Sequence, residues 1–215
     1  MAIVRRLALG LFLLFAAQNA SAFVINGTLD LDPRNPELDD NFDIDIAINA
    51  IGDTASWTVT FVSDQPSAFL GEFYFNVADG DYSFSDFNPD SWQVVTPASE
   101  VGGGNWSNGF IYEANDTENG AGDHRVNAGE SLTFVMTKND GNFVETDFVG
   151  APCATTSAFD GCWQLGAHIQ GFENLPPGSL FLVGNFNGGG NGVPEPGTLA
   201  LFGAALLGLG ALRRS

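Results

Sequence analysis

The chain has 215 residues, and its seven Lys and Arg against 26 Asp and Glu give a formal net charge of −19. Four of the basic residues lie near the two ends, so the region from Phe23 to Val193 holds three basic residues and 25 acidic ones. Such a polyanion repels phosphate backbones, which argues strongly against nucleic acid as a partner. Contents of 44% hydrophobic and 12% aromatic residues indicate a folded domain, because a disordered acidic chain lacks side chains to bury.

Residues 1–22 have the layout of a secretory signal peptide. Arg5 and Arg6 form a basic start, residues 7–17 form an apolar run, and the small residues Ala20 and Ala22 form a cleavage site before Phe23. The run has no polar face, which argues against an amphipathic helix of the mature fold. We therefore expect export, with cleavage after Ala22.

A second hydrophobic segment closes the chain. A Gly-rich linker, residues 188–193, leads into the tetrapeptide Val193-Pro194-Glu195-Pro196, an uncharged run over 197–212, and then Arg213 and Arg214. Sixteen helical residues span about 24 Å, and flanking residues with snorkelling arginines extend this towards the roughly 30 Å of a bilayer core. The run predicts a transmembrane helix. The positive-inside rule places both arginine pairs in the cytoplasm and the acidic body outside the inner membrane.

The order of these three elements resembles the PEP-CTERM sorting signal, a tail also known as the "ice-binding protein C-terminal" domain. The resemblance covers the last 22 or 23 residues, with Pro194, Glu195 and Pro196 as the recognition triplet. It implies an exported protein of a Gram-negative bacterium that makes exopolysaccharide. It also implies a tethered inner-membrane intermediate, recognition by an exosortase that removes the tail, and delivery to the cell surface or extracellular matrix.

Two other interpretations of the tail remain. A GPI signal has small residues, a spacer and a hydrophobic end, but such signals usually end apolar, whereas this chain ends in two arginines and a serine. A plain membrane anchor differs from a sorting signal only in whether cleavage follows.

The middle of the chain alternates between apolar and polar residues, the pattern of half-buried antiparallel strands. The strands predicted from this pattern and from the turn residues between them are 24–31, 41–48, 56–61, 69–77, 92–96, 109–113, 131–137, 142–149, 163–170 and 180–186. Roughly ten short strands without a fixed repeat indicate one all-β domain over residues 23–187. We expect an antiparallel β-sandwich, jelly-roll-like or immunoglobulin-like.

Cys153 and Cys162 are the only cysteines, and both lie in the exported region. Outside the cytoplasm, a pair this close in sequence predicts a disulfide that closes a ten-residue loop. A zinc site needs four ligands, and no histidine lies at the required spacing.

No catalytic motif is recognisable, so we expect no catalytic residues and no enzymatic activity. Residues 105–109 approach a nucleophile elbow but lack its first glycine. His124 and His168 stand alone, and His168 falls on the polar face of its strand, which predicts an exposed side chain. Carboxylates are so abundant that a glycosidase-type pair has almost no specificity as a signal.

The acidic loop around residue 80 is a candidate calcium site. Asp79, Asp81, Asp86 and Asp90 supply the hard oxygen ligands that Ca²⁺ prefers, partly at EF-hand-like offsets. Phe84 replaces the glycine of that motif, so turn chemistry and solubility remain the simpler interpretation. Weaker acidic clusters occur around Asp30 and Asp116.

Aromatic residues in Asn- and Gly-rich surroundings are candidates for stacking on sugar rings. Trp92, Trp106 and Tyr112 meet this condition, although most aromatic residues of such a domain belong to its core. An ice-binding ladder would need repeated Thr-x-Thr units, and Thr58-Val59-Thr60 is not repeated.

Together these patterns predict an exported, non-enzymatic surface or exopolysaccharide-matrix protein with a structural or adhesive role, in which Ca²⁺ could bridge the acidic surface to polysaccharide. A lectin-like carbohydrate-binding module is the alternative. A polysaccharide-modifying enzyme that uses a carboxylate pair is less favoured.

Overall fold

The structure is a computed structural model that describes residues 22–31, 41–98, 109–117, 125–156, 159–172 and 178–188. The expected signal peptide up to residue 21, the linker beyond Gly188, the Pro-Glu-Pro tail and the predicted membrane helix 197–212 lie outside these ranges. Within these ranges, no helix combines the length and the apolar character that a membrane crossing requires.

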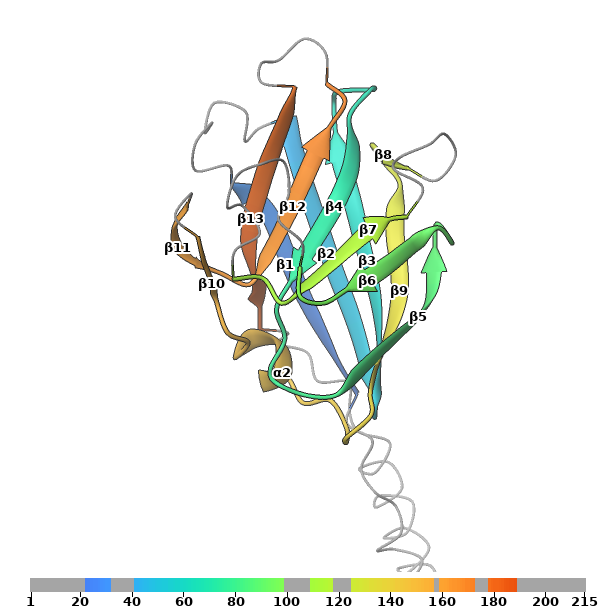
Figure 1. Cartoon of the computed structure of the whole chain (residues 1–215), viewed down its shortest axis with the longest axis vertical. Coiled ribbons are helices and arrows are strands. Elements are labelled where there is room, and N and C mark those ends of the chain that lie inside the picture. Colours follow the sequence, from blue (N-terminus) through green and yellow to red (C-terminus); the bar gives the residue numbers. More distant parts are fainter. Residues whose placement is uncertain are drawn as a thin grey trace, which may run out of the picture.

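Antiparallel strands make up most of the described chain (Figure 1). The strands are β1 (Ala22–Leu31), β2 (Phe42–Ile51), β3 (Thr54–Ser63), β4 (Phe69–Phe75), β5 (Tyr82–Asn88), β6 (Trp92–Val95), β7 (Tyr112–Asp116), β8 (Val126–Asn127), β9 (Ser131–Lys138), β10 (Ala154–Thr156), β11 (Phe159–Trp163), β12 (Leu165–Gln170) and β13 (Ser179–Asn187). A short helix, α2 (Thr146–Val149), follows β9.

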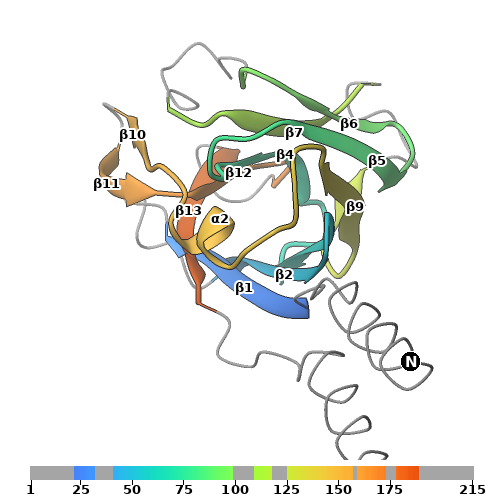
Figure 2. The same cartoon turned by 90° about the horizontal axis from the view of Figure 1, so that it is seen from below.

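One sheet holds all of these strands except β10 and β11. Its order is β5-β9-β3-β2-β1-β13-β12-β4-β7-β6, with β8 paired to β4. The sheet curls on itself into a nearly closed cylinder, which Figure 2 shows end-on, and its two terminal strands β5 and β6 contact each other. The expected all-β antiparallel fold is confirmed, but the strands form one curled sheet rather than the two separate sheets of a sandwich.

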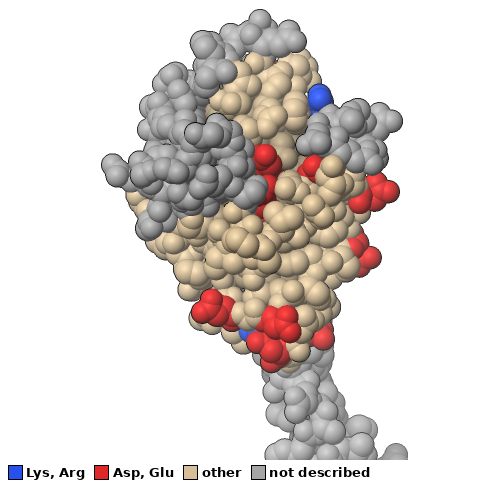
Figure 3. Space-filling view, in the orientation of Figure 1, with Lys and Arg blue, Asp and Glu red and all other residues tan. Residues whose placement is uncertain are grey.

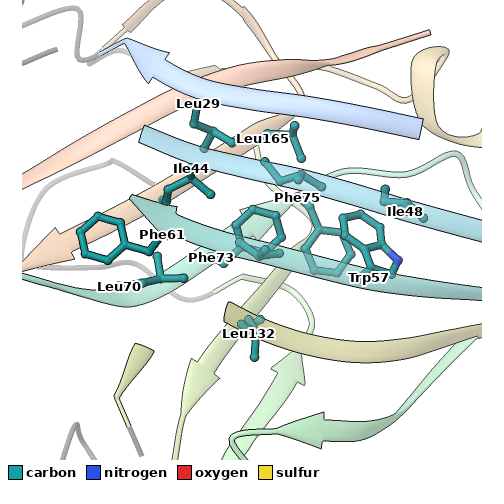
Figure 4. Close-up of a cluster of buried hydrophobic side chains, with 14 of the residues drawn as sticks. Leu29, Ile44, Ile48, Trp57, Phe61, Leu70, Phe73, Phe75, Leu132 and Leu165 are labelled. Atoms are coloured by element: carbon teal, nitrogen blue, oxygen red, sulfur yellow. The ribbon is translucent and has the colours of Figure 1, made fainter. Parts of the chain in front are cut away.

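The interior of the curl is filled by apolar side chains from opposite walls (Figure 4). Trp57 of β3 stacks on Phe134 of β9, with ring centroids 5.3 Å apart. Its ring also lies 6.2 Å from Phe73 and 4.8 Å from Phe75, both on β4, although four strands separate β3 from β4 in the sheet. These contacts close the core, because the inward side chains of the two walls meet directly.

A second apolar layer covers the outer face of β4, β12 and β13. Tyr74, Phe110, Phe181 and Val183 are buried there, together with Ala154 of β10. The hairpin of β10 and β11 belongs to this layer and carries the predicted disulfide between Cys153 and Cys162, whose Cα atoms are 4.9 Å apart. Strands β4, β12 and β13 are therefore largely buried on both faces, unlike the strands of a half-exposed sheet.

Two segments differ from the predicted elements. The strand predicted over 142–149 is wrong, since its second half forms α2. There the Asp147 carboxylate accepts hydrogen bonds from the Val144 backbone N–H at 2.9 Å and from Lys138 Nζ at 3.0 Å. Conversely, β5 occupies residues that were expected to form the calcium loop.

Candidate functional site

Polar side chains gather on the outer face of three neighbouring strands, β12, β4 and β7. The pleat sends alternate residues to opposite faces, so Phe73 and Phe75 point into the core while Glu72 and Tyr74 point outward. The strand register then places partners beside Glu72. His168 of β12 lies opposite Glu72 on one side and Asn115 of β7 lies opposite it on the other.

His168 is the centre of a hydrogen-bond network on this face. Its Nδ1 lies 2.7 Å from Glu72 Oε2, and the tautomer of the imidazole decides which of the two atoms donates. Gln170 Nε2 lies 2.9 Å from the same nitrogen, and the imidazole stacks on Phe181 with centroids 4.5 Å apart. The side chain is buried, so the expectation of an exposed histidine is wrong.

Tyr74 and Asn115 hold the two glutamates of the face. Tyr74 Oη donates to Glu72 Oε2 at 3.0 Å, and Asn115 Nδ2 donates to Glu113 Oε1 at 2.7 Å. Burial, and then the negative charges of Glu72 and Glu113, raise the pKa of Tyr74 far above its usual value. Tyr74 therefore remains a neutral hydrogen-bond donor at all physiological pH values.

A cavity of about 320 Å³, the outer-face cavity, opens beside this network. Carboxylates, amides, one guanidinium, a tryptophan and a short stretch of β4 line it: Phe69, Leu70, Gly71, Glu72, Trp92, Glu113, Asn115, Asp116, Arg125 and Gln170. Figure 3 shows carboxylate atoms in a hollow over the upper half of the molecule. The volume lies in the range of small-molecule sites, and the lining offers both donors and acceptors.

A second hollow of about 710 Å³, the Arg125 hollow, adjoins the first. Its lining comprises Asn88, Pro89, Asp90, Arg125, Val126, Glu130, Ser131 and Thr133. Arg125 lines both hollows, and its guanidinium carbon lies 4.3 Å from the centre of the Phe69 ring. Glu130 Oε2 accepts hydrogen bonds from the backbone and side-chain nitrogens of Asn127, at 2.9 and 3.0 Å.

The aromatic residues predicted to bind sugar differ in how far they are buried. Trp92 is only 3% exposed, so the expectation of an open stacking platform is wrong for this residue, although it borders the outer-face cavity. Tyr112 is half-buried and stacks on Phe75 with centroids 5.2 Å apart. Trp106 and His124 lie outside the described residues.

The predicted calcium ligands are not brought together. Strand β5 runs between Asp81 and Asp90 and includes Asp86, and among the described residues no three or more His, Cys, Asp or Glu side chains are arranged to hold a metal. Asp79 and Asp81 lie near Tyr112, whose pKa is raised by burial and then by these two charges. Calcium binding stays a prediction without a built site in this part of the chain.

Sequence reasoning missed most of the outer-face residues. Glu72 and His168 are 96 positions apart, so only the pairing of β4 with β12 reveals that they meet. The available signal was weak: Glu72 interrupts an otherwise apolar strand, and Glu113 and Asn115 alternate with apolar neighbours.

Comparison with known families identifies the tail of the chain. The family model of the PEP-CTERM protein-sorting motif matches residues 192–214, which confirms the resemblance drawn from the sequence. The motif marks an exported protein with a membrane-anchored intermediate that an exosortase-type enzyme processes. No curated protein and no solved structure matches the chain.

Proposed function

We propose that this chain is a non-enzymatic protein of the cell surface or exopolysaccharide matrix that binds carbohydrate in the outer-face cavity and acts as an adhesive or structural component. The observation that carries the proposal is the lining of that cavity. Carboxylates such as that of Glu72 accept hydrogen bonds, while Gln170 and Asn115 supply amide groups to the lining. A concave wall of planar polar groups suits the many hydroxyls of a sugar ring.

The position of the cavity relative to the sorting tail supports this role. At one end of β13, Ser179 pairs with Gln170 of the cavity wall, and at the other end Asn187 leads towards the tail. Eight residue steps at about 3.3 Å separate these ends by about 26 Å. The first described residue, Ala22, also lies at the end remote from the cavity, where it pairs with Ile51. A tethered intermediate therefore presents the cavity away from its membrane attachment.

A polysaccharide-modifying enzyme is the second candidate. Glu72 and Glu113 are diagonal neighbours on β4 and β7, and pairs of carboxylates hydrolyse glycosidic bonds. Glu72, however, already accepts a hydrogen bond from Tyr74 and lies 2.7 Å from His168 Nδ1, so its carboxylate is engaged within the protein. We therefore favour binding.

Co-sedimentation of the full-length protein, in detergent, with the exopolysaccharide of its own host tests the proposal. Glu72→Gln and Asp116→Asn should each weaken binding several-fold, whereas Asp53→Asn, an exposed carboxylate at the other end of the sheet, should leave it unchanged. Equal binding by all variants would contradict the cavity as the site. Release of reducing ends by the wild type but not by Glu72→Gln would establish the enzyme instead.

A further inference from the structure

We propose that the outer-face cavity and the Arg125 hollow form one groove that takes an oligomer of a cationic amino sugar. This inference rests on the proposed carbohydrate-binding function and names its ligand class. Three observations carry it: the two hollows share Arg125 in their linings, these linings have an excess of negative charge, and a buried acceptor in the wall has no donor.

The two hollows adjoin at Arg125. Arg125 lines both, and its neighbour Val126 lines the Arg125 hollow while pairing with Leu70 of the outer-face cavity. Each volume alone falls in the range of a small-molecule site. We infer that an oligomer spans both hollows, because their joint volume exceeds what a single sugar ring fills.

The charge of the lining selects among polysaccharides. Five carboxylates from the two hollows face one guanidinium, which is the only basic group among the described lining residues: Glu72, Asp90, Glu113, Asp116, Glu130 and Arg125. The rest of the exported region adds to the same negative field. A uronic acid polymer is repelled by this field, whereas an unacetylated amino sugar carries an ammonium group that the carboxylates attract.

A buried acceptor gives an independent indication. The side-chain oxygen of Asn115, in the wall of the outer-face cavity, has no exposed surface and finds no hydrogen-bond partner in the described part of the chain. The Asn115 amide nitrogen is already used, because it donates to Glu113. A group that reached this oxygen would have to donate, as an ammonium or hydroxyl group does.

Binding of defined oligosaccharides to the full-length protein in detergent tests the inference. The probes are six-residue oligomers of glucosamine, N-acetylglucosamine and galacturonic acid, with hexalysine as a charge control, titrated by calorimetry at about 20 mM salt. We expect the glucosamine oligomer to bind at least about ten-fold more tightly than the other three. We also expect this preference to shrink at about 500 mM salt, where exposed charges are screened.

Variants then locate the site. Asp116→Asn and Asp90→Asn, one from each hollow, should each weaken glucosamine-oligomer binding several-fold, while Asp53→Asn should not. If only Asp116→Asn weakens binding, the two hollows do not form one groove and the inference is wrong.

The remaining outcomes separate the inference from the proposed function. Suppose that the N-acetylglucosamine or galacturonic acid oligomer binds as tightly as the glucosamine oligomer, or more tightly, and loses this binding in Asp116→Asn. That result would overturn the amino-sugar assignment and leave carbohydrate binding intact. Equal binding of hexalysine would reduce the preference to charge alone and overturn the inference. If neither the oligosaccharides nor the host polysaccharide bind, the proposed function itself is contradicted.

Discussion

Single residues show where sequence patterns stop being informative. His168 was expected at the surface and Trp92 was a candidate for an exposed stacking platform, and both are buried. The alternation in β12 correctly separates its two faces, but it cannot show that the polar face is covered by a second layer containing Phe181. A polar residue in such a strand needs a partner, and Glu72 supplies it from far along the chain.

Lys138 and Asp147 form an ion pair, and the exposed fractions of their side chains are only 15% and 9%. The Asp147→Asn substitution leaves the lysine charge without its counter-charge, so we expect a loss of about 3 kcal/mol in the free energy of unfolding. Urea unfolding followed by tryptophan fluorescence measures it. Asp140→Asn, at a nearby exposed carboxylate, should change the stability by less than about 0.5 kcal/mol. Equal midpoints for both variants would show that the pair does not stabilise the fold.

At the scale of elements, the alternating pattern predicted most strands, because the curled sheet buries one face of most of them. It failed where alternation is broken. In β5, Tyr82 and Phe84 alternate with serines, but Asp86 takes a positive φ of 55° and the register with β9 shifts there. In α2, one helical turn is too short for a helical period to be seen.

The pairing of β1 with β13 depends on Gly184. A Cβ atom at this position would collide with the carbonyl oxygen of Thr28 and approach Leu29 Cα to 3.3 Å. Because both contacts are to backbone, Gly184→Ala should cost about 1–3 kcal/mol of stability. Gly188→Ala is the matched control, because its Cβ would meet only the side chains of Glu145 at 3.4 Å and Val149 at 4.0 Å. Thermal unfolding compares the two, and an unchanged Tm for Gly184→Ala would show that the strands can separate without cost.

We expect the disulfide between Cys153 and Cys162 to stabilise the β10–β11 hairpin. Replacing both Cys153 and Cys162 by serine removes the cross-link. The cross-link lowers the entropy of the unfolded chain, which for a loop of this size stabilises the folded state by about 2.5 kcal/mol. The variant should unfold at a lower denaturant concentration than the oxidised wild type and match the wild type in reductant. A wild type that is insensitive to reductant would contradict this.

At the scale of the whole molecule, the sequence predicted the sorting motif, because that information is local and terminal. The outer-face cavity could not be predicted, since it exists only where β4, β7 and β12 lie side by side. With 25 acids in the exported region, no pair of carboxylates is distinctive until the register is known.

The net charge of −19 predicts how solubility depends on pH. Carboxylates take up protons near pH 4, so the repulsion between molecules that keeps the exported protein soluble disappears there. Light scattering should show aggregation between about pH 3.5 and 4.5 and none at pH 7. A clear solution across this range would mean that repulsion between carboxylates does not control solubility.

Hydrogen–deuterium exchange of the full-length protein, with and without its host's polysaccharide, tests the carbohydrate site most directly. Our account predicts slower exchange around the two hollows, at residues 69–72, 88–90, 113–116 and 125–131, with no change at residues 51–53 and 139–145 at the opposite end. Protection at that opposite end, or no protection at saturating polysaccharide, would contradict it.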